Sequence, residues 1–194
     1  MTYQYLLELA SLMAIFSFGI VAPGADTAMV MRQAIVHGRR AAILTSFGIG
    51  TSLMFHVGYT ILGLGLVISQ SIMLFNLIKW AGVAYLIYIG VQALRSGSAS
   101  LDVPPVEDKP DVSRQSAVKG FALGFMANAL NPKPVFFFLS IFSTVVSHDT
   151  PASVKFGYGL VMASCLIAWF VAMSFVLTVP RMRALFQRSS KWIN

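Results

Sequence analysis

Five long apolar segments dominate this chain, and they constrain its fold more than any other feature. They cover residues 5–31, 41–69, 72–94, 118–146 and 154–179. Each reaches the roughly 20 residues that an α-helix needs to cross the hydrocarbon core of a bilayer. The composition agrees, because 57% of the residues are hydrophobic and only 11% are charged, whereas soluble domains carry about 25% charged residues. We therefore expect an all-α membrane protein, a polytopic helical bundle.

One long connection divides the chain into two parts. Residues 95–119 are rich in proline, serine and charged residues, whereas the other connections are short. We predict a first transmembrane half of three helices at 1–94, a linker at 95–119, and a second half at 120–194 with two helices and a basic tail. Three helices in each half would invert the second half relative to the first.

The basic residues predict how the chain is oriented. With alternating segments, eleven of the 14 Lys and Arg residues fall on one side of the membrane: Arg32, Arg39, Arg40, Arg95, Lys109, Arg114, Lys119, Arg181, Arg183, Arg188 and Lys191. Only Lys155 falls on the other side. Loops rich in Lys and Arg stay in the cytoplasm. We expect an integral plasma (inner) membrane protein with its N-terminus outside and with the linker and tail in the cytoplasm.

The first apolar segment contains a helix-breaking pair followed by an acid. In "GIVAPGADTAMVMR", Pro23 and Gly24 interrupt the helix and Asp26 follows them. As a structural residue, Asp26 would cap the half-helix or pair with Lys133. As a functional residue it would carry protons, because a carboxyl group at membrane depth can gain and lose a proton near neutral pH. We favour the functional interpretation.

The fourth apolar segment contains the counterpart of this break. "NALNPKPVFFF" places Asn131-Pro132 and then Lys133 inside a predicted helix. Matched breaks in two inverted halves indicate the binding site of a transporter, because the freed backbone groups need a polar cavity and helix N-termini attract a carboxylate. The alternatives are ordinary proline kinks and a Lys133 side chain that extends toward the interface. The candidate substrate-binding residues are Pro23, Gly24, Asn128, Asn131, Pro132 and Lys133.

A second polar feature runs along the segment 41–69. Gly48, Ser52, His56 and Thr60 recur every four residues and therefore share one helix face. His56 could take part in proton coupling with Asp26, because its side chain titrates nearest to neutral pH. It could equally be a hydrogen-bonded structural residue on a packed face.

Small residues predict where helices pack closely. Gly120-x-x-x-Gly124 has the spacing of a tight helix contact. In the last apolar segment, Ser164, Ala168 and Ala172 form a similar row, which permits a homodimer as readily as packing within one chain.

The sequence lacks the motifs of soluble enzymes. It contains no GxSxG, P-loop or HExxH pattern, no acidic cluster for a divalent metal, and a single cysteine, Cys165. We therefore predict no enzymatic activity, no catalytic residue, no cofactor and no metal. The basic residues lie between apolar segments, which argues against binding of nucleic acid.

Three stretches resemble the LysE/RhtB family of amino-acid exporters. They are "APGADTAMVMRQAIVHGRRAAILTSFGIGTS", "LIKWAGVAYLIYIGVQALRS" and "GFMANALNPKPVFFFLSIF". The resemblance follows the order and spacing of the family across most of residues 5–180. It implies efflux of amino acids or close derivatives driven by the proton gradient. The Pro-Gly-x-Asp segment of the family falls on Pro23, Gly24 and Asp26, and its Asn-Pro-Lys segment on Asn131, Pro132 and Lys133.

Two departures from the family pattern stand out. Ala25 occupies a position where the family often has a second proline. The family usually continues with a sixth apolar helix after a basic stretch such as "RMRALFQRSSKWIN", which here ends the sequence. We therefore expect two inverted halves with the sixth helix missing from this chain.

Together these features predict a secondary transporter that exports amino acids by proton antiport with alternating access. Its partners would be the amino-acid substrate, protons and membrane lipid. The alternative is a membrane-embedded interaction or assembly subunit without transport activity of its own, which would bind no amino acid.

Overall fold

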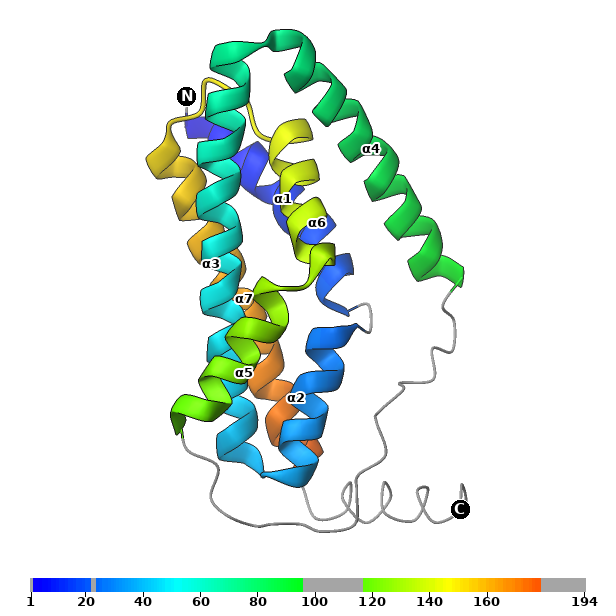
Figure 1. Cartoon of the computed structure of the whole chain (residues 1–194), viewed down its shortest axis with the longest axis vertical. Helices are drawn as coiled ribbons and strands as arrows, with labels where there is room; N and C mark the ends of the chain where they lie inside the picture. The colour runs from blue at the N-terminus through cyan, green and yellow to red at the C-terminus, as the bar shows by residue number, and fades with distance from the viewer. Residues whose placement is uncertain (1, 22–23, 96–116, 179–194) are drawn as a thin grey trace.

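A computed structural model describes residues 2–21, 24–95 and 117–178 of the chain, and within these residues it contains helices and no strand (Figure 1). The helices are α1 (Thr2–Val21), α2 (Ala25–Val36), α3 (Arg39–Gln70), α4 (Ile72–Arg95), α5 (Ala117–Ala129), α6 (Pro132–Thr144) and α7 (Ala152–Leu177). The prediction of an all-α membrane protein is confirmed.

Two of the five apolar segments are divided into pairs of shorter helices. The first consists of α1 and α2, and the fourth consists of α5 and α6, whereas α3, α4 and α7 are continuous. By length and composition α1, α3 and α7 are each able to cross a membrane, and the apolar part of α4, Ile72–Tyr88, is shorter. The interruptions fall at the two stretches where the sequence combines proline, glycine or asparagine.

The two interrupted pairs run in opposite directions. In Figure 1, the chain descends from the N-terminus through α1 and α2, and it ascends through α5 and α6. Both interruptions lie near mid-height of the bundle, and α2 packs against α5. The N-terminal ends of α2 and α6 therefore both face the middle of the molecule.

Helix α3 is the central element, and it packs most extensively against α5 and α7. Glycines allow the backbones of α3 and α5 to approach closely: a Cβ at Gly124 would overlap the Thr45 carbonyl oxygen, and a Cβ at Gly48 would overlap the Phe121 carbonyl oxygen. Thr45 also donates a hydrogen bond to the Gly120 carbonyl at 3.0 Å. This is the close packing that the Gly120-x-x-x-Gly124 spacing predicted.

Helix α4 lies at one side of the bundle and packs mainly against α6 (Figure 1). Its outer face carries large exposed apolar side chains, among them Met73 and Trp80. Ser164, Ala168 and Ala172 are exposed on α7. Such apolar outer surfaces fit a lipid environment, where no water is available to form hydrogen bonds with polar groups.

Candidate functional site

The first interruption leaves the start of α2 without a side-chain cap. Gly24 is the N-cap, with an extended backbone (φ −159°, ψ −174°), and no side chain accepts a hydrogen bond from the first turn there. Asp26 lies in this first turn, where the helix dipole favours a negative charge. Pro23 lies outside the described residues.

The second interruption is capped and fixed from two sides. Asn131 precedes α6, and its Oδ1 accepts a hydrogen bond from the backbone N–H of Lys133 at 3.0 Å. Pro132 begins the helix, where its fixed φ and missing N–H cost nothing. The Tyr85 hydroxyl of α4 donates to the Lys133 carbonyl at 3.3 Å. Asparagine and proline therefore begin a new helix here instead of kinking a continuous one.

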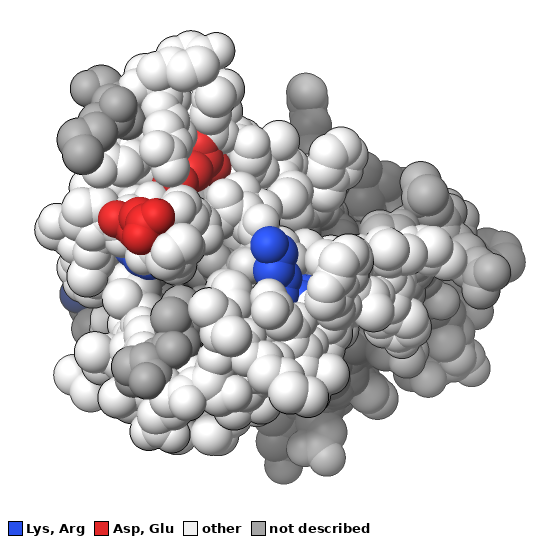
Figure 2. Space-filling view, turned by 90° about the horizontal axis from the view of Figure 1, so that it is seen from above, with Lys and Arg blue, Asp and Glu red and all other residues white. Residues whose placement is uncertain are grey.

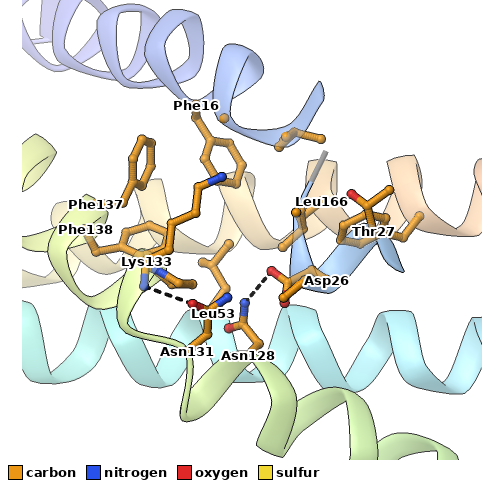
Figure 3. A pocket seen from close by; sticks show the side chains of 16 residues that line it. Phe16, Asp26, Thr27, Leu53, Asn128, Asn131, Lys133, Phe137, Phe138 and Leu166 are labelled. Atoms are coloured by element: carbon orange, nitrogen blue, oxygen red, sulfur yellow. Dashed lines mark hydrogen bonds between the residues drawn. The ribbon is translucent and has the colours of Figure 1, made fainter. Parts of the chain in front are cut away.

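Both interruptions border one pocket (Figure 3). Its volume is about 80 Å³, enough for about five water molecules, and α4 is absent from the described residues that line it. The lining residues are Phe16, Gly19, Ile20, Gly24, Ala25, Asp26, Thr27, Leu53, Asn128, Asn131, Lys133, Pro134, Phe137, Phe138, Leu166 and Phe170. Segments far apart in the sequence thus form a single cavity between the two helix breaks.

A hydrogen bond across the pocket joins the two halves of the chain. The Asn128 side-chain nitrogen on α5 donates to Oδ2 of Asp26 on α2 at 2.8 Å. Asn128 is 3% exposed. The other two side-chain oxygens of this pair, Asp26 Oδ1 and Asn128 Oδ1, are buried and accept no hydrogen bond from the described residues. The pair is therefore joined by one hydrogen bond and keeps two oxygens without a donor among the described residues.

Lys133 brings the opposite charge to the same pocket. Its side chain extends across the cavity toward Phe16 (Figure 3), and its Nζ lies 3.6 Å from the position that a Cβ on Gly24 would occupy. Within the described part of the chain, no ion pair joins Lys133 to Asp26. An acid and a base thus line one cavity without touching each other.

The rest of the pocket is apolar and aromatic. Phe16 of α1 contacts both Phe137 and Phe138 of α6, with ring centroids 6.2 Å away in both cases. Leu166 and Phe170 of α7 complete this side. Such a surface suits the apolar part of a small molecule whose charged ends are held elsewhere.

Comparison with known proteins identifies the family. Residues 17–194 match the LysE type translocator family. The chain belongs to this family. It is similar to the threonine efflux protein of Escherichia coli strain K12, with 29% identity over 177 residues that cover 90% of this chain and 84% of the relative. LysE type translocators are transporters rather than enzymes, so the resemblance inferred from sequence and the prediction of a non-enzymatic protein are confirmed.

Two further relatives cover slightly less of the translocator. The homoserine/homoserine lactone efflux protein of Salmonella typhimurium is 29% identical over 173 residues, which cover 89% of this chain and 77% of the relative. The membrane protein YrhP of Bacillus subtilis is 32% identical over 165 residues, which cover 81% and 77%. No solved structure matches the chain.

His56 of the translocator lies behind the pocket. Its Nε2 is 3.1 Å from the Asn128 carbonyl oxygen, and its Nδ1 is 2.7 Å from the Tyr59 hydroxyl. Because a carbonyl only accepts, the neutral ring carries its proton on Nε2, and Nδ1 then accepts from Tyr59. The ring also stacks on Phe138, with the planes 8° apart. His56 thus contacts two residues that line the pocket, Asn128 and Phe138, but is not itself among the lining residues.

The structure gathers most of the predicted site residues of the translocator. Five of them line the pocket: Gly24, Asp26, Asn128, Asn131 and Lys133. Pro132 shapes the start of α6 but is absent from the lining, as is His56. Among the described residues, no group of three or more His, Cys, Asp or Glu side chains could hold a metal ion.

Sequence reasoning missed the aromatic side of the pocket. Phe137 and Phe138 directly follow the predicted break in "NPKPVFFF", so their nearness to the site was available as a signal. Phe16, Leu166 and Phe170 reach the pocket through helix packing, and nothing in their local sequence distinguishes them from other apolar residues that face lipid or core.

Proposed function

We propose that this translocator exports amino acids or close derivatives across the plasma (inner) membrane by proton antiport with alternating access. Its relatives include a threonine efflux protein and a homoserine/homoserine lactone efflux protein, and these names support this class of substrate. The observation that carries the proposal is a single pocket at two helix breaks, with Asp26 and Lys133 lining it without forming an ion pair.

The substrate carboxylate binds between Lys133 and the uncapped first turn of α2. Residues at the N-terminal ends of α2 and α6 both line the pocket, and helix N-termini attract anions. Lys133 Nζ lies beside Gly24, which precedes that first turn. A carboxylate at this point receives a positive charge and backbone N–H groups together, which compensates for its loss of water.

Asp26 is the proton carrier in this proposal. It takes a proton from the outside and releases it inside while the substrate moves outward. His56 is the second group proposed for proton coupling, because it contacts Asn128, the hydrogen-bond partner of Asp26. If His56 carries protons, His56→Gln shifts the pH profile of export. If His56 only orients Asn128, the variant lowers the rate and leaves the shape of that profile unchanged.

Alternating access follows from the antiparallel broken helices. The halves at 1–94 and 120–194 each contribute one broken pair, and the pocket lies where these pairs meet. Rocking of one half against the other would open the pocket to each side in turn. The geometry of the α1–α2 and α5–α6 pairs supports this mechanism.

The orientation proposed has the N-terminus outside and the linker 95–119 in the cytoplasm. The α2–α3 turn, with Arg39 and Arg40 at the start of α3, lies at the opposite end from the N-terminus (Figure 1). On the end that carries the N-terminus, Figure 2 shows two groups of Asp or Glu atoms and few Lys or Arg atoms among the described residues. A reporter in the linker should be accessible only from the cytoplasm, and labelling of it from outside would contradict this orientation.

The test is transport by the purified chain in proteoliposomes. Vesicles made acidic inside are offered labelled L-threonine, L-homoserine and the other common amino acids in turn. We expect accumulation of at least one of them, abolished by a protonophore. Accumulation that survives the protonophore would overturn proton coupling. Transport and binding of none would favour the alternative of an assembly subunit.

A further inference from the structure

Two buried side-chain oxygen atoms have no hydrogen-bond donor among the described residues. They are Asp26 Oδ1 and Asn128 Oδ1, and both side chains line the cavity. Asn128 is 3% exposed, so its amide is not compensated by bulk solvent. A buried acceptor left unsatisfied costs about 1–3 kcal/mol, and more when it is charged.

The orientation of the Asn128 amide follows from its partner. An ionised carboxylate only accepts hydrogen bonds, so the nitrogen of Asn128 must face Asp26 Oδ2. The amide oxygen is then left to accept from another donor. The hydrogen bond holds the two side chains next to each other, and each keeps one oxygen that accepts no hydrogen bond from the described residues.

The chemistry of the site favours an ammonium group. An ammonium carries three donors and a positive charge, which matches one amide oxygen and one carboxylate oxygen. A hard divalent cation would need six or more oxygen ligands, and no cluster of three acidic or metal-binding residues exists among the described residues. The ammonium of Lys133 forms no ion pair with Asp26.

We propose that Asp26 Oδ1 and Asn128 Oδ1 bind the α-ammonium group of the exported amino acid. This inference rests on the proposed function, which already assigns the carboxylate to Lys133. The zwitterion would then span the gap between Asp26 and Lys133, and its side chain would face the aromatic surface of Phe137 and Phe138.

One consequence is a simple mode of proton coupling. Asp26 cannot hold a proton and an ammonium group on the same oxygen, so each displaces the other. The titratable groups facing Asp26 from neighbouring elements are Lys133 on α6 and, through Asn128, His56 on α3. Antiport then follows from competition between the proton and the ammonium group at one carboxylate.

The test compares amino acids with their α-hydroxy acids, in which a neutral hydroxyl replaces the ammonium group. Purified full-length chain in detergent is titrated with L-threonine, L-homoserine and L-leucine and with the three matching hydroxy acids. We expect at least tenfold tighter binding of the amino acid in each pair that binds, since a hydrogen bond to a charged group contributes about 1.5–3 kcal/mol. Equal affinity within a pair overturns the ammonium site and leaves the proposed function intact.

Two variants test separately how the ammonium group and the carboxylate of the substrate are bound. Asp26→Asn should lose most of the preference for the amino acid while it still binds the hydroxy acid, which also reports that the variant is folded. Lys133→Gln should weaken both members of a pair by similar factors. Retention of the full preference in Asp26→Asn would contradict the inference. If the wild-type chain binds neither member of any pair, even with the panel extended to all common amino acids, the proposed function fails and the ammonium site fails with it.

Discussion

The translocator contains two acids on helices of its first apolar segment, and their surroundings differ sharply. Glu8 on α1 is 7% exposed and both of its carboxylate oxygens accept hydrogen bonds. Asp26 on α2 has one hydrogen bond, from Asn128, and one buried oxygen without a donor among the described residues. Both acids belong to the same helical bundle, but Glu8 has donors for both oxygens and Asp26 has a donor for one.

Glu8 connects three parts of the fold. Its Oε1 accepts from the Ser147 backbone N–H at 3.2 Å and lies 3.0 Å from the Thr150 hydroxyl, and its Oε2 accepts from the Tyr158 hydroxyl at 3.0 Å. These partners come from the α6–α7 connection and from α7, while Glu8 lies on α1. A charge held by several donors is a structural anchor, because removing it would leave those donors unsatisfied.

The comparison teaches how to distinguish an anchoring acid from an exchanging acid. Burial alone does not do so, since Glu8 is buried and Asp26 also has a buried carboxylate oxygen. The hydrogen-bond inventory does: a saturated carboxylate gains nothing from a further ligand, whereas an unsaturated carboxylate gains from a proton or an ammonium group. Neutralising each acid in turn should therefore give opposite results for transport and stability.

The largest expected effect is on transport. Asp26→Asn keeps the size of the side chain and an oxygen for Asn128, but it cannot exchange a proton. We expect uphill export in proteoliposomes to fall at least a hundredfold. The matched control, Glu8→Gln, should keep export within about threefold at a temperature where it remains folded. Near-normal accumulation by Asp26→Asn would assign that carboxylate a structural role.

The second effect is on stability, and here Glu8→Gln should be the more harmful of the two substitutions. Glu8→Gln replaces charge-assisted hydrogen bonds by neutral ones and should lower the free energy of unfolding by about 1–3 kcal/mol. Asp26→Asn removes a buried unsatisfied charge and should leave stability unchanged or raise it. Thermal unfolding of the two variants in the same detergent measures this difference. An equal loss of Tm in both would remove the distinction between the acids.

The third expected effect concerns the helix contact that positions Asn128. Gly124 lies one turn before Asn128 on α5, and a Cβ there would overlap the Thr45 carbonyl of α3. Gly124→Ala should destabilise the fold by about 1–3 kcal/mol and weaken substrate binding, because α3 and α5 must separate. Gly120→Ala is the control on the same helix face, since its nearest atoms would lie at an ordinary 3.5 Å. Similar unfolding curves for the two variants would show that this contact does not control the pocket.

The positions of the helix breaks were available from the sequence, because they depend on local chemistry. Proline removes a backbone donor, and asparagine caps a new helix. The stretch "NPKP" therefore ends α5 and begins α6 through its own local chemistry. The apolar segments likewise predicted α3, α4 and α7 within a few residues. Because the sequence matched the two breaks to each other, it also predicted residues that meet in one pocket: Gly24, Asp26, Asn128, Asn131 and Lys133.

The hydrogen-bond state of each acid was not available from the sequence. Besides Gln4, one turn away on α1, the donors to Glu8 lie 139 to 150 residues away along the chain, and no periodicity or motif connects these distant donors to Glu8. The same limit applies to His56, whose contacts with Tyr59 and Asn128 the sequence did not predict. Partners of this kind are set by tertiary packing rather than by local sequence.

Proton release on substrate binding tests the central claim most directly, namely that a proton and the substrate compete for Asp26. Purified protein in weakly buffered detergent solution, at a pH where Asp26 is protonated, is mixed with a saturating amount of an amino acid that it binds. We predict release of close to one proton per bound amino acid from the wild-type chain and from Glu8→Gln, and none from Asp26→Asn. Binding without proton release in the wild type, or undiminished release from Asp26→Asn, would contradict the account.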